Sequence, residues 1–436
     1  MTIRITKPIQ GGTVRAIASK SEAHRLLICT ALADSDTFVA CTEISEDINA
    51  TARCLEAMGA AVQYERCDGF SVNPISHKGR KTSQSSQNCV LDCGESGSTL
   101  RFLLPICGAL GYRTTFHMGG KLPKRPLSAL YDEMVAHGCT LSEQGQSPLT
   151  CEGQLKSGSY DLPGNVSSQF ISGLLFALPI LKGDSIIRVR GILESRPYVD
   201  MTLDALKSFS IAVTEVEEGV FHISGGQEYR SPSTVRAKGD WSNAAFWLSA
   251  GAIGHGEVTC TGLDMKSRQG DRAIIELLES FGARVTIERN SVTVSPGELR
   301  GIDIDAGNTP DLVPVLAAVA STAEGRTVIR NAERLRIKES DRLHTVATSL
   351  TSLGADVTET EDGLVINGKK TLAGGKTQSF GDHRIAMTAA VISAACTGPV
   401  IINNAEAVNK SYPTFFEDFN TALGGTWETH FRITKA

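Results

Sequence analysis

The sequence lacks a basic excess. Among its 436 residues, Lys and Arg total 43 and Asp and Glu total 48, which gives a formal net charge of −5. Domains that hold nucleic acid electrostatically usually carry a clear positive excess, so this balance argues against a nucleic-acid partner. A small anionic substrate needs only a few well-placed cations, and the composition leaves room for one.

Long apolar runs are also missing. The most apolar stretches, such as 174–181, are too short to span a bilayer core of about 30 Å, so we expect no membrane partner. The opening segment, MTIRITKPIQ, has no apolar run of the kind that a signal peptide needs. Length and ordinary composition instead predict a soluble globular chain of two or three domains.

Disulfide and metal patterns are absent as well. The 11 cysteines are an odd number, and nine of them lie in the first 151 residues without a CxxC pair or a His at metal-ligand spacing. This pattern argues against a disulfide scaffold or a zinc site. It predicts reduced, buried thiols and a cytoplasmic location. Walker, GxGxxG, HExxH and GxSxG motifs are missing too, so the familiar nucleotide, metalloprotease and hydrolase signatures do not apply.

What the sequence does contain is a repeat. An apolar helix, a glycine and a β-rich run recur at intervals of 70 to 79 residues, as in CLEAMGAAVQ, LLESFGARVT and TSLGADVTE. The glycine falls at positions 59, 138, 282, 354 and 424, and Ser210 takes its place once. Each of these residues lies where a helix ends in a left-handed residue, immediately before a strand.

A second helix recurs in the same phase. It is apolar nearly all round, as in SGSTLRFLLPICGALG and DWSNAAFWLSAGAIG, so we expect it to be buried. The unit is therefore a buried helix, a strand, an outer helix, a glycine and strands, and six units of about 72 residues fill the chain. We predict an α/β protein of two lobes with three units each, formed by 20–237 and by 1–19 plus 238–436.

Polar and charged residues gather in the first turns of the buried helices. A helix N-terminus offers free N–H groups and a partial positive charge, which suits an anion. Plain N-capping would explain any one of these starts, but it does not explain why Lys, Arg, Gln and His accompany the caps. These first turns are Lys20-Ser21 with Arg25, Ser96-Gly97-Ser98-Thr99 with Arg101, Ser167-Ser168-Gln169, Asp240-Trp241-Ser242, Thr309-Pro310-Asp311 and Asp382-His383-Arg384.

A second set of charges follows the strands after these helices. It comprises Lys121 with Lys124-Arg125-Pro126, Ser195-Arg196-Pro197-Tyr198, the 266–271 segment KSRQGD, the 334–342 segment RLRIKESDR, and Asn409-Lys410-Ser411-Tyr412. These clusters occupy the same position in each repeat unit, which predicts that they form one cationic centre. Any single cluster, taken alone, could instead be a set of solvated surface charges. Asp311, Glu339 and His383 lie among these cations and are candidates for proton transfer. A carboxylate beside Lys338 and Arg342 is normally ionised, so salt bridging is the alternative role of Glu339.

The chain resembles the 5-enolpyruvylshikimate-3-phosphate synthase family. The matching elements are SKSEAHR, SGSTLR, KRP, SSQF, SRPY, KGDWSNA, RQGD, TPD, RIKESDR, DHR and NKSYP, in order from residue 19 to 413. The resemblance implies the two-lobed enolpyruvyl transferase fold, in which each lobe has three copies of an α/β unit with parallel inner helices. It also implies an active-site cleft that closes between the lobes when substrate binds.

The resemblance implies transfer of the enolpyruvyl group of phosphoenolpyruvate to the 5-hydroxyl of shikimate 3-phosphate, with release of phosphate and no metal or cofactor. Asp311 would be the base and Glu339 the proton donor, with Lys20 and His383 also in the catalytic set. The shikimate 3-phosphate ligands would be Lys20, Ser21, Arg25, Ser167, Ser168, Gln169, Ser195, Tyr198, Asp311 and Lys338. The phosphoenolpyruvate ligands would be Lys20, Gly97, Arg125, Gln169, Arg342, Arg384 and Lys410. We expect a monomer.

Three other interpretations compete with this one. The related transferase that acts on UDP-N-acetylglucosamine typically carries a reactive Cys or Asp in the loop equivalent to 119–126, which here reads GGKLPKRP. An RNA 3′-phosphate cyclase would require a nucleotidylated His and a basic surface. A non-catalytic anion-binding repeat protein would need no acid or base among its cations. The motifs SSQ, SRPY and DHR favour the shikimate enzyme.

Overall fold

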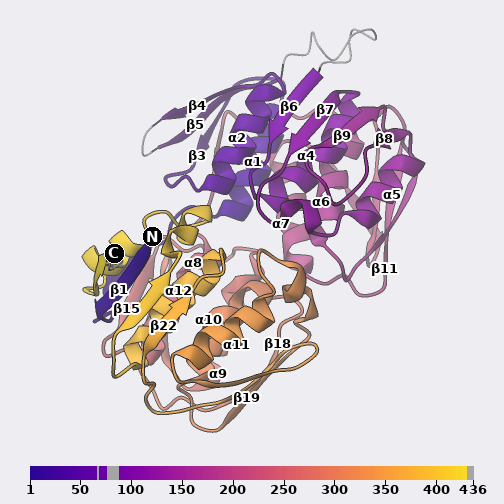
Figure 1. The fold of residues 1–436 in the computed structure, drawn as a ribbon. Coiled ribbons are helices and arrows are strands. Elements are labelled where there is room, and N and C mark those ends of the chain that lie inside the picture. Colours follow the sequence, from indigo (N-terminus) through magenta and orange to yellow (C-terminus); the bar gives the residue numbers. More distant parts are fainter. Residues whose placement is uncertain (66–67, 76–87, 430–436) are drawn as a thin grey trace, which may run out of the picture. The chain divides into compact units, whose positions relative to one another are not determined.

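The computed structural model describes residues 1–65, 68–75 and 88–429, and the chain divides into two compact units (Figure 1). The continuous unit is formed by 18–237, drawn from indigo to magenta. The discontinuous unit combines 1–17 with 238–436 and holds both labelled chain ends. Each unit has its own hydrophobic core, so each is described by itself.

In the described part of the chain, each unit contains three four-stranded sheets. The strands of the continuous unit are β3 (Thr37–Ala40), β4 (Ala61–Glu65), β5 (Gly69–Asn73), β6 (Asn88–Asp92), β7 (Arg113–His117), β8 (Cys139–Leu141), β9 (Leu149–Gly153), β10 (Ser159–Pro163), β11 (Ser185–Arg190), β12 (Thr214–Glu217), β13 (Val220–Ile223) and β14 (Thr234–Arg236). The strands of the discontinuous unit are β1 (Thr2–Lys7), β2 (Gly12–Arg15), β15 (Val258–Thr261), β16 (Arg284–Ile287), β17 (Ser291–Ser295), β18 (Asp303–Asp305), β19 (Arg326–Arg330), β20 (Asp356–Glu359), β21 (Leu364–Asn367), β22 (Gly375–Gln378), β23 (Val400–Asn403) and β24 (Thr426–Thr429).

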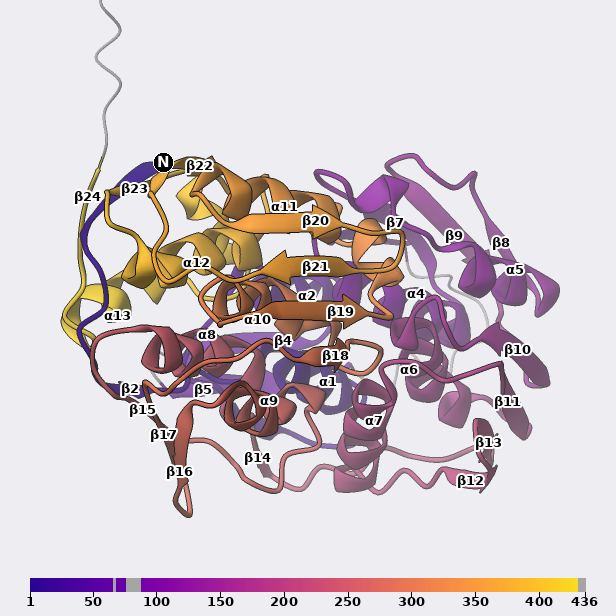
Figure 2. The same ribbon diagram turned by 90° about the horizontal axis from the view of Figure 1, so that it is seen from below.

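All six sheets share one topology, which is why the repeat is visible in the sequence. In the order β18-β19-β21-β20, the first two strands are parallel and the remaining pairs antiparallel, as Figure 2 shows for the orange strands. The orders β6-β7-β9-β8 and β10-β11-β13-β12 repeat this pattern. A parallel pair needs a crossover connection, and in these three sheets the buried helix between the two parallel strands supplies it.

Three sheets are completed by strands from distant parts of the chain. Strand β2 precedes the first helix but pairs with β15, whereas β14 precedes the helix at 241–253 but pairs with β3. The N-terminal strand β1 lies between β23 and β24 and closes the sixth sheet. The last unit of the repeat is therefore completed by β1.

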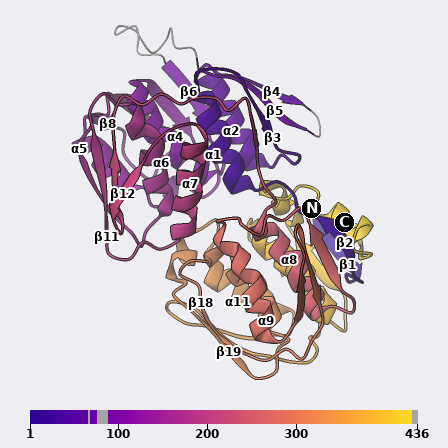
Figure 3. The same cartoon turned by 180° about the vertical axis from the view of Figure 1, so that it is seen from behind.

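The predicted buried helices are confirmed. They are α1 (Lys20–Ala31), α4 (Gly97–Leu110), α6 (Ser168–Ala177), α8 (Trp241–Ile253), α10 (Val313–Ala320) and α12 (His383–Ile392). Every residue of α10 and α12 is buried, and most residues of the other four are too. In the discontinuous unit α8, α10 and α12 contact one another, and in the continuous unit α4 packs on α6 (Figure 3).

Outer helices alternate with the inner ones. They are α2 (Glu46–Ala57), α5 (Ser128–Ala136), α7 (Arg196–Ser208), α9 (Ile274–Phe281), α11 (Arg342–Ser352) and α13 (Phe415–Thr421). The predicted left-handed residues after them are confirmed, because Gly59, Gly138, Gly282, Gly354 and Gly424 all have φ between 67° and 105°. Ser210 adopts the same conformation with φ of 62°, although it carries a Cβ atom.

Replacing Ser210 with Gly is expected to stabilise the protein. An L-residue in the left-handed region costs about 1–2 kcal/mol, and the greater freedom of Gly in the unfolded chain cancels part of that gain. We expect the free energy of unfolding in a denaturant titration to rise by about 0.5–1 kcal/mol. Ser208→Gly, at the last residue of α7, is the matched control and should lower it by a similar amount. A loss of stability in Ser210→Gly would contradict the interpretation that this position, like the repeated glycines, favours a residue without a Cβ atom.

Two smaller observations complete the fold. No helix among the described residues is both long enough and apolar enough to cross a membrane. The ten described cysteines are free thiols, and all but the partly exposed Cys396 are buried. The eleventh, Cys67, lies outside the described residues.

Candidate active site

One buried arginine contacts three carboxylates of the discontinuous unit. Arg342, the first residue of α11, is only 2% exposed in its side chain. Its Nη1 lies 2.8 Å from Asp311 Oδ1, its Nη2 2.7 Å from Glu339 Oε2, and its Nε 2.8 Å from Asp382 Oδ2. Burial alone would lower the pKa of Arg342, but these carboxylates outweigh it and raise the pKa. One guanidinium thus joins three segments of the sequence at a single point.

Asp311 lies in the short helix η4 (Pro310–Leu312) at the start of α10 and meets a second arginine. Arg384 Nη2 is 3.0 Å from Asp311 Oδ2, and its Nη1 donates to the Asp311 carbonyl at 3.1 Å. Burial raises the pKa of Asp311, but the positive charges of Arg384, Lys338 and Arg342 prevail and hold it well below its ordinary value. The Asp311 carboxylate is therefore ionised at neutral pH, and the same cations make it a weaker base than an ordinary aspartate.

Lys338 and Glu339 immediately precede α11, and both interact electrostatically with Arg342. Burial lowers the pKa of Lys338 to about 8, although Asp311 and Glu339 oppose this shift. The ammonium group therefore loses its charge a little above neutrality. Glu339 forms the ion pair with Arg342 that the sequence suggested as its alternative role. Its role as proton donor stays a prediction.

The start of α12 supplies the remaining groups. Asp382 caps this helix by accepting from the Arg384 amide at 2.9 Å while it binds Arg342. His383 is 2% exposed, and its Nδ1 lies 3.9 Å from Asp382 Oδ1. Lys410, at the end of η7 (Ala405–Lys410), donates to the Gly381 carbonyl at 2.8 Å. The structure therefore brings Lys410 to the same helix start, as the shared phase predicts.

The KSRQGD segment does not form a cationic surface as a whole. Gln269 and Asp271 are buried, with 2% and 0% of their area exposed. Gln269 Nε2 donates to Asp240 Oδ1 at 2.8 Å, and Ser242 in the first turn of α8 donates to Asp271. The sequence analysis grouped this segment with the basic clusters because a sequence shows the residue types but not which side chains are buried.

In the continuous unit, Arg25 is held by backbone and hydroxyl acceptors. Its Nε donates to Thr202 Oγ1 at 2.9 Å, Nη1 to the Ser21 carbonyl at 2.7 Å and Nη2 to the Tyr198 carbonyl at 2.8 Å. Burial lowers its pKa to about 10, which leaves the guanidinium charged at neutral pH. Lys20, at the start of α1, pairs with Asp47 at 2.9 Å.

The remaining predicted residues of this unit occupy helix starts. Ser167 caps α6 by accepting from the Gln169 amide, and Ser168 is buried at the first position of that helix. Ser195 precedes α7 in the left-handed conformation with φ of 54° and is 4% exposed. The Ser195 hydroxyl makes no side-chain cap hydrogen bond to α7.

Arg101 was predicted to lie at a helix start, but the sequence assigned it to neither substrate. It lies one turn into α4, and its Nη1 donates to Gln169 Oε1 at 2.7 Å while its Nη2 donates to the Pro126 carbonyl at 3.0 Å. Gln169 in turn donates to Ser98 Oγ at 2.9 Å. Arg101 thus links α4 and α6 to the loop that carries Arg125. Its position beside Gly97 in the SGSTLR motif was the signal that could have found it.

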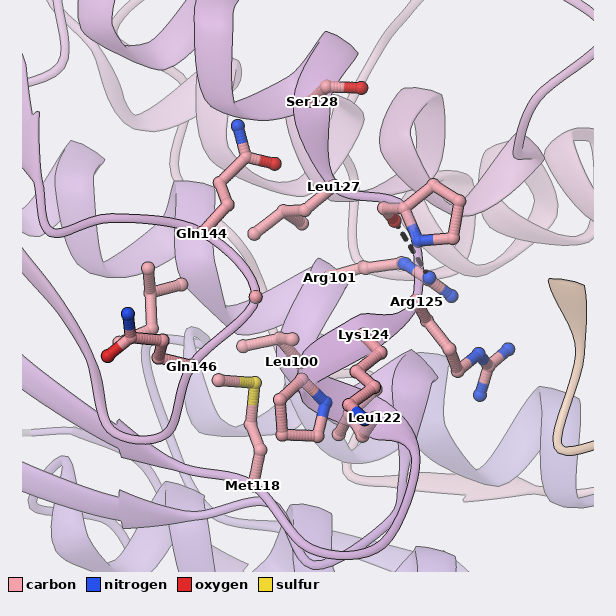
Figure 4. A pocket seen from close by; sticks show the side chains of 14 residues that line it. Leu100, Arg101, Met118, Leu122, Lys124, Arg125, Leu127, Ser128, Gln144 and Gln146 are labelled. Carbon is pink, nitrogen blue, oxygen red and sulfur yellow. Dashed lines mark hydrogen bonds between the residues drawn. The ribbon is translucent and has the colours of Figure 1, made fainter.

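Gly97 lies against both arginines. A Cβ atom on Gly97 would come within 2.9 Å of Arg125 Nη1 and 3.0 Å of Arg101 Nη1. The loop that carries Arg125 includes η1 (Leu122–Lys124) and borders a cavity of about 210 Å³ (Figure 4). In Figure 4 the Arg125 guanidinium points away from Met118 and Gln146, so it is not directed into that cavity.

Among the described residues, no group of three or more His, Cys, Asp or Glu side chains is arranged to hold a metal ion. Taken separately, each unit presents a group of cations around inner-helix starts. The discontinuous unit adds a strongly ionised carboxylate. Such an arrangement can bind phosphate and carboxylate groups and can accept a proton from a hydroxyl held beside them.

Comparison with known proteins identifies the family. The sequence profile of EPSP synthase (3-phosphoshikimate 1-carboxyvinyltransferase) matches residues 3–419. The 3-phosphoshikimate 1-carboxyvinyltransferase of Clostridium kluyveri is 45% identical over 415 residues, 95% of each chain, and that of Clostridium perfringens is 44% identical over 95% of this chain and 96% of its own.

Solved structures agree with this assignment. The EPSP synthase of Acinetobacter baumannii superposes with a TM-score of 0.80 at 26% identity, covering 98% of this chain and 100% of that one. The enolpyruvyl transferase NikO of Streptomyces tendae shares the fold, with a TM-score of 0.77 at 18% identity and 98% of each chain covered. The chain therefore belongs to the EPSP synthase (3-phosphoshikimate 1-carboxyvinyltransferase) family.

Proposed function

We propose that this chain transfers the enolpyruvyl group of phosphoenolpyruvate to the 5-hydroxyl of shikimate 3-phosphate and releases inorganic phosphate. Membership of the family supports this reaction over transfer to UDP-N-acetylglucosamine. The observation that carries it is Asp311, a carboxylate kept ionised among Arg342, Arg384 and Lys338. A proton acceptor inside a cationic site suits the activation of a hydroxyl between two anionic substrates.

In the proposed reaction, the methylene carbon of phosphoenolpyruvate gains a proton and the adjacent carbon becomes electrophilic. The 5-hydroxyl oxygen attacks that carbon and loses its proton to Asp311. The resulting tetrahedral intermediate then loses a methyl proton and phosphate, which restores the double bond. The bond that breaks joins the enolpyruvyl carbon to the phosphate oxygen, and the P–O bonds of the departing phosphate stay intact.

The discontinuous unit would supply the proton-transfer groups and much of the phosphoenolpyruvate site. Glu339 would protonate the methylene carbon. This role requires that the bound anions compete with Glu339 for Arg342, so that the protonated form of Glu339 becomes accessible. Arg342, Arg384 and Lys410 would hold the phosphate and carboxylate of phosphoenolpyruvate, and Lys338 would contact shikimate 3-phosphate. His383, buried at the start of α12, would complete the catalytic set with Asp311, Glu339 and Lys20.

The continuous unit would supply the other ligands. For shikimate 3-phosphate we propose the residues Ser21, Arg25, Ser167, Ser168, Ser195 and Tyr198. Gly97 and Arg125 would contact phosphoenolpyruvate, while Lys20 and Gln169 would contact both substrates. Arg25 donates hydrogen bonds to Thr202, Ser21 and Tyr198, so its role in the ligand-free protein is partly structural. We propose that the two units are the two domains of the enzyme, and that it acts as a cytoplasmic monomer.

The function is tested by mixing the protein with phosphoenolpyruvate and shikimate 3-phosphate and measuring phosphate release. We expect steady release that depends on both substrates. A parallel reaction replaces shikimate 3-phosphate with UDP-N-acetylglucosamine and should give none. Release in the second reaction alone would overturn the proposal in favour of the related transferase.

Replacing Gly97 with Ala is expected to weaken the use of phosphoenolpyruvate. The added methyl group would come within 2.9 Å of Arg125 Nη1, so this flexible side chain must shift away from its position. We expect the KM for phosphoenolpyruvate to rise about tenfold, equivalent to about 1.4 kcal/mol, with little change in the KM for shikimate 3-phosphate. Initial rates at varied substrate concentrations measure both constants.

The thermal midpoint provides the control for Gly97→Ala. Ala is a better helix former than Gly, so this midpoint should not fall. An unchanged KM for phosphoenolpyruvate would contradict the placement of Gly97 and Arg125 at that substrate.

A further inference from the structure

We propose that Thr51 is a positioning residue for phosphoenolpyruvate, because its buried hydroxyl fixes the spacing between the start of α1 and the start of α4. These two helix starts carry Lys20 and Gly97, which are proposed contacts of that substrate. The inference therefore rests on the proposed function and deepens it. Thr51 itself has no part in the proposed reaction.

Four buried side chains from three helices form one chain of hydrogen bonds. His24 Nδ1 of α1 lies 2.7 Å from Thr51 Oγ1 of α2, which lies 2.7 Å from Thr99 Oγ1 of α4. Thr99 Oγ1 donates to the Oγ of Ser96, the N-cap of α4, at 2.8 Å. None of the four residues is more than 1% exposed, so water does not compete for these hydrogen bonds.

The protons of this chain run in one direction. A hydroxyl group has a single proton, and Thr99 uses its proton on Ser96, so Thr99 must accept from Thr51. Thr51 then has no proton left for His24 and must accept from an Nδ1–H group. His24 is neutral, because burial and two nearby cations lower its pKa well below the ordinary value. Its Nε2 is therefore unprotonated, which agrees with the lack of a hydrogen-bond partner for that atom among the described residues.

The first half of the chain ties α2 to the part of α1 that carries Lys20. Lys20 and His24 are one turn apart on α1, and Asp47 and Thr51 are one turn apart on α2. The ion pair between Lys20 and Asp47 at 2.9 Å and the hydrogen bond between His24 and Thr51 therefore join the same two helix faces. Thr51 thus helps to set where Lys20 lies.

The second half of the chain ties α2 to the start of α4. Helix α2 contacts both α1 and α4 (Figure 1), and Thr51 is the residue of α2 that bonds to both. Ser96, at the end of the chain, precedes Gly97, where a Cβ atom would come within 2.9 Å of Arg125 Nη1. The proposed shikimate 3-phosphate ligands of this unit lie on or beside α1, α6 and α7 instead. A change in the spacing of α1 and α4 should therefore affect phosphoenolpyruvate more than shikimate 3-phosphate.

The test compares Thr51→Val with Thr51→Ser by measuring kcat and both KM values from initial rates. Val has the shape of Thr without the hydroxyl, so it cuts the chain and leaves buried groups of His24 and Thr99 without their partner. We expect the KM for phosphoenolpyruvate to rise roughly tenfold, because small displacements of binding groups weaken a site strongly. The KM for shikimate 3-phosphate and kcat should each change by less than about threefold. Ser restores the hydroxyl and should recover most of the affinity for phosphoenolpyruvate.

Thr30→Val is the matched control. Thr30 lies near the end of α1 and is fully buried, and its hydroxyl has no hydrogen-bond partner among the described residues. This variant also removes one buried hydroxyl but leaves the chain intact, so both KM values should stay near those of the intact enzyme. A merely structural role of Thr51 would lower the stability of Thr51→Val in a denaturant titration and leave its KM for phosphoenolpyruvate unmoved.

His24 provides a second pair of variants at the other end of the chain. His24→Leu removes the donor to Thr51, whereas His24→Asn replaces Nδ1–H with an amide N–H of similar reach. The KM for phosphoenolpyruvate should rise roughly fivefold in His24→Leu and be largely restored in His24→Asn. If Thr51→Val fails to fold, this pair decides, and equal KM values in its two members overturn the proposal.

An unchanged KM for phosphoenolpyruvate in Thr51→Val, or an equal rise in both KM values, would also overturn it. The failure of the proposed function is a separate outcome, since the intact enzyme would then release no phosphate from the two substrates.

Discussion

Asp311→Asn is expected to reduce kcat by roughly 10²–10⁴-fold, the range typical for loss of a general base. The amide cannot accept the proton of the 5-hydroxyl, whereas Arg342 and Arg384 keep their charges. The KM for phosphoenolpyruvate should therefore stay near its original value or fall, because one buried negative charge has been removed. Initial rates with both substrates measure this separation of kcat from KM.

The pKa of Asp311 adds a prediction about pH. Arg384, Lys338 and Arg342 hold it well below its ordinary value despite burial, so its carboxylate stays ionised far into the acid range. A loss of activity between neutrality and pH 5 should therefore come from other groups.

Asp303→Asn is the matched control, because Asp303 lies in the same unit and pairs with an arginine, Arg330, on the exposed surface. It should leave kcat unchanged. Near-normal turnover in Asp311→Asn would rule out Asp311 as the base.

Arg342→Met is expected to destabilise the protein by about 3–5 kcal/mol, the usual cost of removing one partner from a buried ionic cluster. Met has a similar length and fills the space, so the loss reflects charge more than packing. It leaves Asp311, Glu339 and Asp382 without the cation that all three contact. Turnover should fall to background as well, since Arg342 is also a proposed ligand of phosphoenolpyruvate. Denaturant titration measures the stability, and phosphate release measures the turnover.

Arg336→Met provides a matched comparison. Arg336 also binds two carboxylates, Asp341 at 3.1 Å and Glu359 at 2.6 Å, but its side chain is 28% exposed. Water can replace its partners, so we expect a loss of at most about 1 kcal/mol and near-normal turnover. Equal losses in the two variants would mean that burial does not set the strength of the Arg342 cluster.

The repeat could be predicted from the sequence because it depends on local physics. A helix that is apolar on all sides must be buried, and a left-handed helix end favours Gly. Both signals recur in phase, so the six units and their inner helices followed from the pattern. Even the left-handed conformation of Ser210 was predicted, because the residues around it follow the repeat although Ser replaces the usual Gly. The helix starts then indicated where anions would bind.

Which residues pair with one another is a different matter. That Arg342 would bind Asp311 and Asp382, 31 and 40 positions away, depends on how α10, α11 and α12 pack. The exchange of β2 and β14 between sheets likewise involves pairing over 246 positions for β2 with β15 and 196 positions for β14 with β3.

Sequence alone thus determined the repeat, the buried helices, the family and the residue types of the site, because these depend on local preference and periodicity. Only the tertiary structure decided that Arg101 supports Gln169 and the Arg125 loop, and that Asp271 is buried against Ser242 at the start of α8. The physical reason is that burial and charge coupling arise between segments far apart in the chain. They depend on which surfaces pack together, and no local pattern records that choice.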